Sequence, residues 1–295
     1  MSELNASASS VPAGGRHDLV TVDGRCFAIS DEAGDMVAAT HGLVFDDLRH
    51  LSRLRMTVTG GHVELLAAST PAPLSAVVVS RVVTAVVADE GHDATKRAHD
   101  DVSEVLAIRR RWLAGSLVEQ LTLRNPHPLP VSVHLELELA ADFAHVFDVK
   151  SGLATATSSA RVETDTPGRW RLVSPDDEQD STQIVLQPEP DESEPVRGTA
   201  GWYLRIGGRE EVTVVVTVQP VSAGVPADLE RPSELAAGTP IRELTAWRST
   251  VPNVVSLDPR LPAAVEQALA DLAALRIVDQ AHPCLLYTSP SPRDS

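Results

Sequence analysis

The sequence predicts an all-β protein, an antiparallel β-sandwich or barrel that is followed by a helical segment. Residues 131–139 (VSVHLELEL) alternate strictly between apolar and polar side chains, which is typical of a half-buried antiparallel strand. Many similar short segments, rich in β-branched residues, follow one another with turn signals such as Gly60-Gly61 between them. No helical period separates these segments, so parallel βαβ units are not expected.

The expected strands occupy the first two thirds of the chain. Residues 117–123 are the expected partner of 131–139, because the Asn-Pro-His-Pro sequence at 125–128 is a turn signal. The charged, proline-rich stretch 174–198 is expected to include an exposed loop. The other predicted strands are 51–59, 63–67, 75–87, 104–112, 168–173, 183–187, 201–206 and 212–218.

The pattern changes after residue 221. Residues 232–248 can form a helix that is interrupted at 238–240, where Gly and Pro occur. Residues 261–278 follow an Asp-Pro start signal and predict a second helix, with apolar side chains near helical spacing. We interpret this second helix as the first of a larger helical domain. Its apolar positions are Leu261, Val265, Leu269, Leu272, Leu275 and Ile277.

The last twelve residues, 284–295 (CLLYTSPSPRDS), differ in composition from the rest of the chain. Elsewhere arginine strongly exceeds lysine, of which the chain has only Lys96 and Lys150, a skew typical of GC-rich coding DNA. The tail is mainly Ser, Pro and Thr, and it resembles one reading frame of a sequencing-library adapter. We interpret it as an adapter-derived artefact, which makes the chain an N-terminal fragment. A disordered polar C-terminus is the alternative.

Composition narrows the expected partners and location. The chain has 41 acidic and 25 basic residues, and its formal net charge of -16 repels nucleic acid and anionic membranes. No apolar run has the form of a secretory signal or the length of a membrane span. We therefore expect a cytoplasmic protein with no nucleic-acid or membrane partner. Apart from the tail, Cys26 is the only cysteine, which excludes a disulfide framework and a cysteine-based zinc site.

Segments of the chain resemble bacterial glycogen debranching enzymes of the amylo-alpha-1,6-glucosidase type. Residues 27–56 (FAISDEAGDM, then HGLVFDDLRHLSRLRM) are similar to the family's opening, in which G-L-F-x-x-D-T-R-x-L-S precedes the first long strand. Asp47 and Arg49 match that pattern, and Leu48 replaces its threonine. Residues 270–277 (ADLAALRI) resemble the start of the family's catalytic domain.

Two further segments carry the resemblance between these ends. Residues 109–125 (RRRWLAGSLVEQLTLRN) are similar to the family's hairpin. Residues 139–150 (LAADFAHVFDVK) are similar to its following A-D-F-x-D-x-F-E-V-R segment. His145 and Asp148 depart from that pattern, since they occupy the places of an acidic residue and a glutamate. Together the matches extend over residues 25–283.

The resemblance implies a β-sandwich of the supersandwich type, then linker helices and the first helix of a truncated α/α barrel. In the intact protein, the barrel would hydrolyse alpha-1,6-glucosidic branches of glycogen-like glucans by an inverting mechanism. The general acid and base would lie in this barrel, beyond Pro283. The expected partners are therefore the chain's own missing catalytic barrel and an alpha-glucan substrate. The implied units are 1–18 (flexible N-terminus), 19–222 (β-sandwich), 223–260 (linker with helix), 261–283 (start of the helical domain) and 284–295 (tail).

Two other functions remain open. The chain could be a stand-alone carbohydrate-binding or structural β-sandwich module with no enzyme attached. It could also be the N-terminal domain of another alpha-glucoside or trehalose hydrolase with the same plan of sandwich and barrel. Residues of the barrel would separate the last possibility from a debranching enzyme.

Two carboxylate pairs within the chain are candidates for glycoside hydrolysis, which needs two carboxyl groups that flank the scissile bond. Asp46 and Asp47 are poorly placed to act together, because neighbouring residues of a strand point to opposite faces. For Asp142 and Asp148, hydrogen bonds to backbone amides or pairing with an arginine are favoured over catalysis. Asp47 with Arg49 is interpreted as a local ion pair or as a contact to a following domain.

The remaining candidate residues have structural interpretations. The run from Arg109 to Arg111 is expected to be solvated or to have carboxylate partners. The ten histidines show no metal-binding spacing, and no phosphate-binding loop or nucleophile elbow occurs. No catalytic, cofactor-binding or metal-binding residue is therefore predicted in the chain. Sugar binding favours exposed aromatic platforms, but core roles are preferred for Trp112, Trp170, Trp202 and Trp247.

Overall fold

The computed structural model describes residues 18–85, 102–154, 160–227, 251, 255–256, 258 and 260–275. These residues form an all-β, antiparallel sandwich, as predicted. The strands are β1 (Leu19–Asp23), β2 (Cys26–Ser30), β3 (Gly42–Phe45), β4 (Leu48–Leu51), β5 (Arg53–Thr59), β6 (Gly61–Ala72), β7 (Ser75–Ala85), β8 (Val102–Ala114), β9 (Ser116–Arg124), β10 (Val131–Ala140), β11 (Arg161–Thr166), β12 (Arg169–Val173), β13 (Ser181–Gln187), β14 (Glu192–Glu194), β15 (Thr199–Ile206), β16 (Glu211–Ser222) and β17 (Val225–Pro226). The helices are α1 (Val146–Ser151), the 3-10 turn η1 (Pro195–Arg197) and α4 (Arg260–Ala274).

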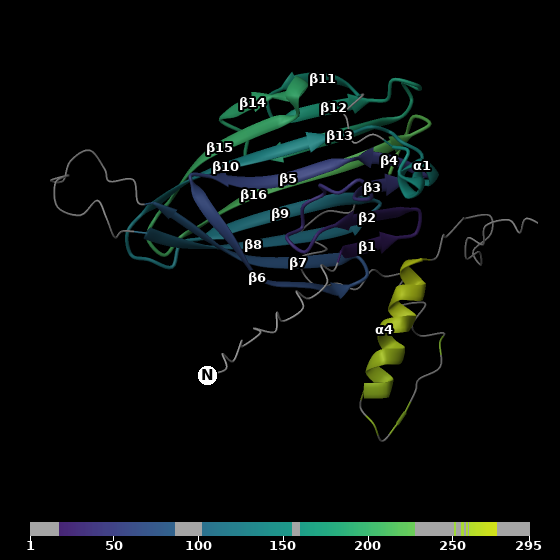
Figure 1. Ribbon diagram of the computed structural model, residues 1–295, viewed down its shortest axis with the longest axis horizontal. Helices are drawn as coiled ribbons and strands as arrows, with labels where there is room; N and C mark the ends of the chain where they lie inside the picture. Colours follow the sequence, from purple (N-terminus) through teal and green to yellow (C-terminus); the bar gives the residue numbers. More distant parts are fainter. Residues whose placement is uncertain are drawn as a thin grey trace, which may run out of the picture.

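The strands make three sheets in two layers (Figure 1). One layer is a nine-stranded sheet in the order β11-β12-β13-β16-β9-β8-β7-β6, with β17 paired to β16. The other layer contains two four-stranded sheets, β1-β2-β3-β4 and β14-β15-β10-β5. These two are joined where the Ser52 amide donates to the Ala140 carbonyl (2.8 Å) and the Arg49 amide donates to the Ala144 carbonyl (2.9 Å).

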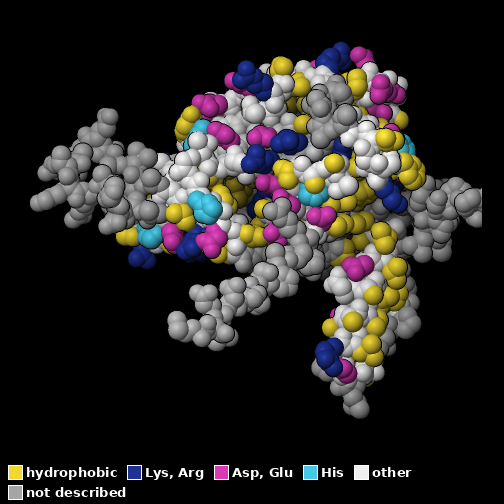
Figure 2. Space-filling view, viewed as in Figure 1, with side chains coloured by type: hydrophobic (Ala, Val, Ile, Leu, Met, Phe, Trp, Pro, Cys, Tyr) yellow, Lys and Arg dark blue, Asp and Glu magenta, His cyan; other side chains and the backbone are white. Residues whose placement is uncertain are grey.

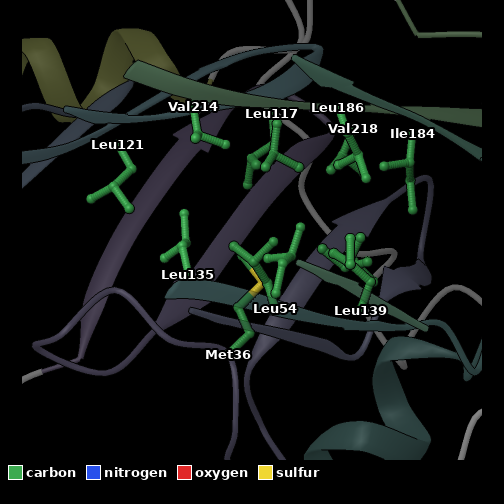
Figure 3. Packing of buried hydrophobic residues seen from close by; sticks show 14 of the residues in the cluster. Met36, Leu54, Leu117, Leu121, Leu135, Leu139, Ile184, Leu186, Val214 and Val218 are labelled. Carbon is green, nitrogen blue, oxygen red and sulfur yellow. The ribbon is translucent and has the colours of Figure 1, made fainter. Parts of the chain in front are cut away.

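The main hydrophobic core fills the space between the layers. In β10, Val131, Val133, Leu135, Leu137 and Leu139 are buried, as their alternation predicts. Figure 3 shows Leu135, Leu139, Leu54 and Met36 of one layer opposite Leu117, Leu121, Val214 and Val218 of the other. Burial of each of these side chains stabilises the fold by roughly 1.5–3 kcal/mol.

The predicted pairing of 117–123 with 131–139 is wrong. β9 pairs with β8 and β16, whereas β10 pairs with β5 and β15 in the opposite layer. The connection crosses between layers instead of making a hairpin. Asn125 is fully buried there, and its side-chain amide donates to the carbonyls of Leu129 (2.7 Å), Gly207 (3.1 Å) and Ile206 (3.3 Å). These bonds hold the crossing in place.

The other predicted strands are present with shifted ends, and the structure adds β1 to β4, β11, β14, β17 and α1. The four strands from β1 to β4 have only four or five residues each, and β3 is buried on both faces. Such short segments lack the alternation that marks a longer strand. The predicted helix at 232–248, the tail 284–295 and Trp247 lie outside the described residues. So do residues 86–87 of the predicted strand 75–87 and residues 1–17 of the predicted flexible N-terminus.

The second predicted helix is present as α4, and the part of the prediction after residue 275 lies outside the described residues. Its C-terminal end contacts the sandwich, where the Gly24 amide donates to the Ala274 carbonyl (2.6 Å) and Ala270 is buried. Figure 2 shows a stripe of hydrophobic side chains along α4. No helix among the described residues is long and apolar enough to cross a membrane.

Candidate functional site

The two acidic residues of the first motif form a tight turn. Asp46 and Asp47 connect β3 to β4, and both have left-handed backbones, with φ of 47° and 66°. The reason given above for their poor placement is therefore wrong, because they lie in a turn and not on a strand. Asp46 forms an ion pair with Arg25 (2.8 Å), and the exposed Asp47 accepts the Val146 amide at its carbonyl (2.8 Å).

The sequence suggested a local ion pair between Arg49 and Asp47. In the structure, Arg49 pairs with Asp142 instead. The Arg49 Nε donates to Asp142 Oδ1 (3.0 Å), and its Nη2 pairs with Oδ2. Both side chains are buried, with 1% and 5% of their surfaces exposed. Arg49 Nη1 also donates to the His41 carbonyl (3.2 Å). The arginine therefore ties the first motif to the segment that follows β10, and the expected structural contact of Asp142 with an arginine is confirmed.

Asp148 is separated from this pair. It lies exposed in the short helix α1, whereas Asp142 precedes that helix and is buried. His145 caps α1, with its Nδ1 accepting the Phe147 amide (3.3 Å). The Phe147 ring lies 5.3 Å from the His145 ring and is 68% exposed. α1 thus presents an aromatic side chain at the end of the sandwich that also carries the Asp46–Asp47 turn (Figure 1).

A second buried cluster of charges lies between the layers. Arg109 and Arg111 on β8 both bind Glu119 on β9: Arg109 through Nε to Oε1, and Arg111 through Nε to Oε2 (2.8 Å). Arg109 Nη1 also donates to Asp35 Oδ1 (2.6 Å). Arg109, Arg111 and Glu119 have exposed fractions of 8%, 3% and 1%. The expected carboxylate partners are confirmed for two of the three arginines, and Arg110 lies on the opposite face of β8.

This cluster holds the loop between β2 and β3. Arg111 Nη1 donates to Ser30 Oγ (2.7 Å), and its Nη2 donates to the Gly34 carbonyl (2.6 Å). Gly34 has φ of 86°, and a Cβ at this position would lie 3.1 Å from the Arg109 guanidinium. The loop therefore needs glycine both for its backbone and for the close approach of the arginine.

Electrostatics keep the cluster charged. Burial acts to raise the pKa of Glu119, but the charges of Arg109 and Arg111 and their hydrogen bonds outweigh it and hold that pKa below its ordinary value. Burial likewise acts to lower the pKa of Arg109, and Glu119 and Asp35 raise it above its ordinary value. The carboxylate and guanidinium groups therefore serve each other as counter-charges.

Glu119 was not singled out by the sequence analysis, although a signal exists. It shares the alternation of Leu117, Leu121 and Leu123, which all face the core. A glutamate at a core-facing position of a strand requires a buried cation as its partner. Arg109 and Arg111 occupy core-facing positions of the neighbouring strand β8, opposite Leu121 and Glu119. A comparison of the core-facing residues of the two strands would therefore have predicted the cluster.

Two other titratable groups, the Cys26 thiol and the His50 ring, are buried. Burial raises the pKa of the Cys26 thiol well above its ordinary value, with smaller effects of Asp23 and Asp46, so Cys26 packs as an apolar side chain. Burial lowers the pKa of His50 to about 4. The His50 ring makes edge contacts with the rings of Phe45 and Phe143. Because its pKa is lowered to about 4, the ring is neutral near pH 7.

The charged groups described here hold the fold together, since Asp35, Asp142 and Glu119 are bound to buried arginines. In the part of the chain that the structure describes, no group of three or more His, Cys, Asp or Glu side chains could hold a metal ion. Trp170 and Trp202 are core residues, as predicted, and Trp112 is half-buried. The absence of catalytic residues from the chain remains a prediction.

A family model described as the N-terminal domain of (some) glycogen debranching enzymes matches residues 22–217. The chain belongs to this family. The matched range contains all the charged residues of the two buried clusters. In this member of the family, the Arg49–Asp142 pair and the Arg109–Glu119–Arg111 cluster bring together the segments 27–56, 109–125 and 139–150 that carried the resemblance.

A solved structure described as "Putative kojibiose phosphorylase from human microbiome" is similar to the chain, with a TM-score of 0.42 and 7% sequence identity. The match covers 85% of this chain and 35% of that one, so the chain spans about a third of the length of that structure. No curated protein sequence matches the chain.

Proposed function

We propose that the chain is the non-catalytic N-terminal domain of a bacterial, cytoplasmic glycogen debranching enzyme. In this proposal, the whole protein hydrolyses alpha-1,6-glucosidic branches of glycogen-like glucans. Its general acid and base lie in a helical domain that follows residue 283, and the sandwich positions that domain. The observation that carries the proposal is the family match over residues 22–217.

The buried charges support a scaffolding role for the sandwich. Glycoside hydrolysis needs a carboxylic acid and a carboxylate on either side of the bond. Asp142 and Glu119 are buried and bound to arginines, so neither is placed to meet a sugar. The exposed carboxylate of Asp148 lies on α1, and that of Asp47 lies in the turn bonded to α1, on the end of the sandwich that also contacts α4. This end is suited to contact a following domain.

The test compares two proteins made from one locus. The first is the 295-residue chain, and the second is the product of the gene read through to its natural stop codon. Both are incubated with a phosphorylase limit dextrin, and the new reducing ends that hydrolysis of its branches releases are measured. We expect them from the longer product alone. Turnover by the 295-residue chain that disappears in Asp47→Asn would overturn the proposal, and so would a natural stop directly after residue 283 with no helical domain.

A further inference from the structure

One patch on the outer face of the sandwich combines an exposed aromatic ring with polar groups. Tyr203 on β15 is 59% exposed and stands directly opposite His134 on β10. The two rings are stacked, with centroids 4.2 Å apart and planes inclined by 7°. The Tyr203 hydroxyl donates to Glu192 Oε1 (2.8 Å). The ring is therefore fixed in place although most of it faces solvent.

The backbone beside Tyr203 is fixed as well. Its amide donates to Asp191 Oδ2 (2.7 Å), and the neighbouring Trp202 is buried and donates through Nε1 to the Pro188 carbonyl (3.0 Å). A rigid aromatic side chain binds a ligand at a smaller entropic cost than a flexible one. An exposed aromatic ring held by His134 and Glu192 is not needed for the core, whose large side chains lie on the other face of β15.

Acceptors for hydroxyl groups surround the ring. Gly201 lies between Glu136 and Glu192 on the adjacent strands, and it places no side chain between these two carboxylates. A Cβ at this position would lie 3.3 Å from His134 Nε2 and 3.4 Å from Glu192 Oε2. The side chains of Glu136 and Glu192 are 48% and 60% exposed. Carboxylates form strong hydrogen bonds with hydroxyl donors.

His134 lies between the two carboxylates without touching either. Its Nδ1 is 3.8 Å from Glu136 and its Nε2 is 3.9 Å from Glu192. Nε2 is buried and makes no hydrogen bond to any of the described residues. The histidine therefore serves as the packing surface for one face of the Tyr203 ring, and the exposed carboxylates remain the groups that a ligand hydroxyl can reach.

We propose that Tyr203, with His134, Glu136 and Glu192, forms a binding site for a neutral alpha-glucan chain on the outer face of β10 and β15. The apolar face of a glucose ring packs on the aromatic ring, and its hydroxyl groups donate to the carboxylates. The negative charge of Glu136, Asp191 and Glu192 disfavours anionic polymers. The choice of an alpha-glucan rests on the proposed function. The site would retain the polymer during hydrolysis elsewhere in the whole protein.

The test uses the 295-residue chain. Retardation in native gels that contain glycogen detects binding to the polymer, and titration with maltoheptaose gives the dissociation constant. We expect the wild-type chain to bind and Tyr203→Ala to weaken binding about tenfold, the upper end of what an aromatic contact contributes. Tyr203→Phe keeps the ring and should lose less. The matched control is Phe147→Ala, because Phe147 is also an exposed aromatic beside a histidine. It should bind like the wild type.

Several results would overturn this site. They are failure of the wild-type chain to bind, wild-type binding by Tyr203→Ala, and an equal loss in Phe147→Ala. Circular dichroism checks that Tyr203→Ala is folded. If Tyr203→Ala is not folded, Glu192→Gln on the short edge strand β14 replaces it in the test. Wild-type binding by Glu192→Gln would then contradict the site. None of these results bears on the proposed function, which is tested by debranching activity of the longer gene product.

Discussion

Arg49 and Asp142 are 93 residues apart in the sequence and form a buried ion pair that joins β4 to the end of β10. One residue belongs to the opening motif of the family and the other to the segment before α1. The pair lies where the two four-stranded sheets meet. It therefore fixes the junction between them and the position of the Asp46–Asp47 turn.

Removing one member of this pair should destabilise the protein strongly. Asp142→Asn leaves the Arg49 guanidinium buried without its counter-charge, and the expected loss is about 3–5 kcal/mol of unfolding free energy. Urea unfolding followed by circular dichroism measures the loss. Glu163→Gln is the control, because its partners Arg161 and Arg171 are 58% and 42% exposed and surface pairs contribute little. Similar losses for both variants would contradict this role of Arg49.

Two variants of the cluster around Glu119 should differ in how strongly they lower the unfolding free energy. Glu119→Gln removes the charge that both Arg109 and Arg111 bind, whereas Asp35→Asn removes only one partner of Arg109. Asp35 is also the more exposed carboxylate, at 15% against 1%. Glu119→Gln should therefore cost more unfolding free energy, by on the order of 1–3 kcal/mol. An equal or smaller effect of Glu119→Gln in urea unfolding would show that Asp35 is the main counter-charge.

The sequence predicts some of these features because they are local. The alternation in β10 depends on neighbouring residues alone, and it correctly gives the buried face of Leu135 and Leu137. The pairing of β9 could not be read in the same way, because the turn signal at 125–128 fits both a hairpin and a crossing between layers. The partner of Arg49 is equally non-local, since nothing near it in the sequence indicates Asp142. Resemblance to a family located the important segments, but not the contacts between them.

His50 should make stability depend on pH. Its pKa is lowered by burial to about 4 in the folded protein, against about 6.5 in the unfolded chain. Between these values the unfolded chain takes up a proton that the folded protein does not, so stability falls as pH falls from 6.5 to 4. The contribution is about 1.4 kcal/mol per pH unit, or on the order of 3 kcal/mol in total. It is fully retained above pH 6.5.

The pH effect can be isolated with a variant. His50→Gln removes the titrating group, so the slope of its unfolding free energy between pH 6.5 and 4 should be smaller than that of the wild type. Urea unfolding at several pH values gives both slopes. The comparison variant is His145→Gln, which removes a histidine at the exposed N-cap of α1. Parallel curves for His50→Gln and the wild type would contradict the assignment.

Two glycines with the same backbone conformation should respond differently to alanine. Gly198 has φ of 70° and Gly224 has φ of 75°, so a side chain is strained at either position. A Cβ at Gly198 would lie 2.0 Å from the Leu139 carbonyl oxygen, whereas a Cβ at Gly224 would have no neighbour within 4 Å. Gly224→Ala should cost about 1 kcal/mol, the strain alone. Gly198→Ala adds displacement of β10 and should lower the melting temperature much further. Equal melting temperatures would show that the backbone near Leu139 yields easily.

Helix α4 should cause self-association of the chain. Leu261 and Leu272 on α4 and Leu275 directly after it are 51%, 47% and 50% exposed, while Ala270 and Ala274 are buried. Exposed leucines in one stripe favour contact with a second apolar surface. We therefore expect sedimentation velocity to show dimers or larger species whose fraction rises with concentration. Leu272→Gln combined with Leu275→Gln should reduce this fraction, since glutamine keeps the helix propensity of leucine and removes its apolar surface.

Removal of residues 261–295 provides the second arm of this experiment. If α4 belongs to a separate helical domain, the shortened chain should be monomeric and should melt close to the wild-type temperature. Removal of α4 would eliminate the contact of Ala270 with the sandwich and the hydrogen bond from the Gly24 amide to the Ala274 carbonyl. Both contacts lie at the edge of the sandwich. Ala270→Glu tests that contact in the 295-residue chain and should likewise leave the sandwich folded. If either change unfolds the sandwich, α4 is part of its core, and the boundary that we place at residue 260 is wrong.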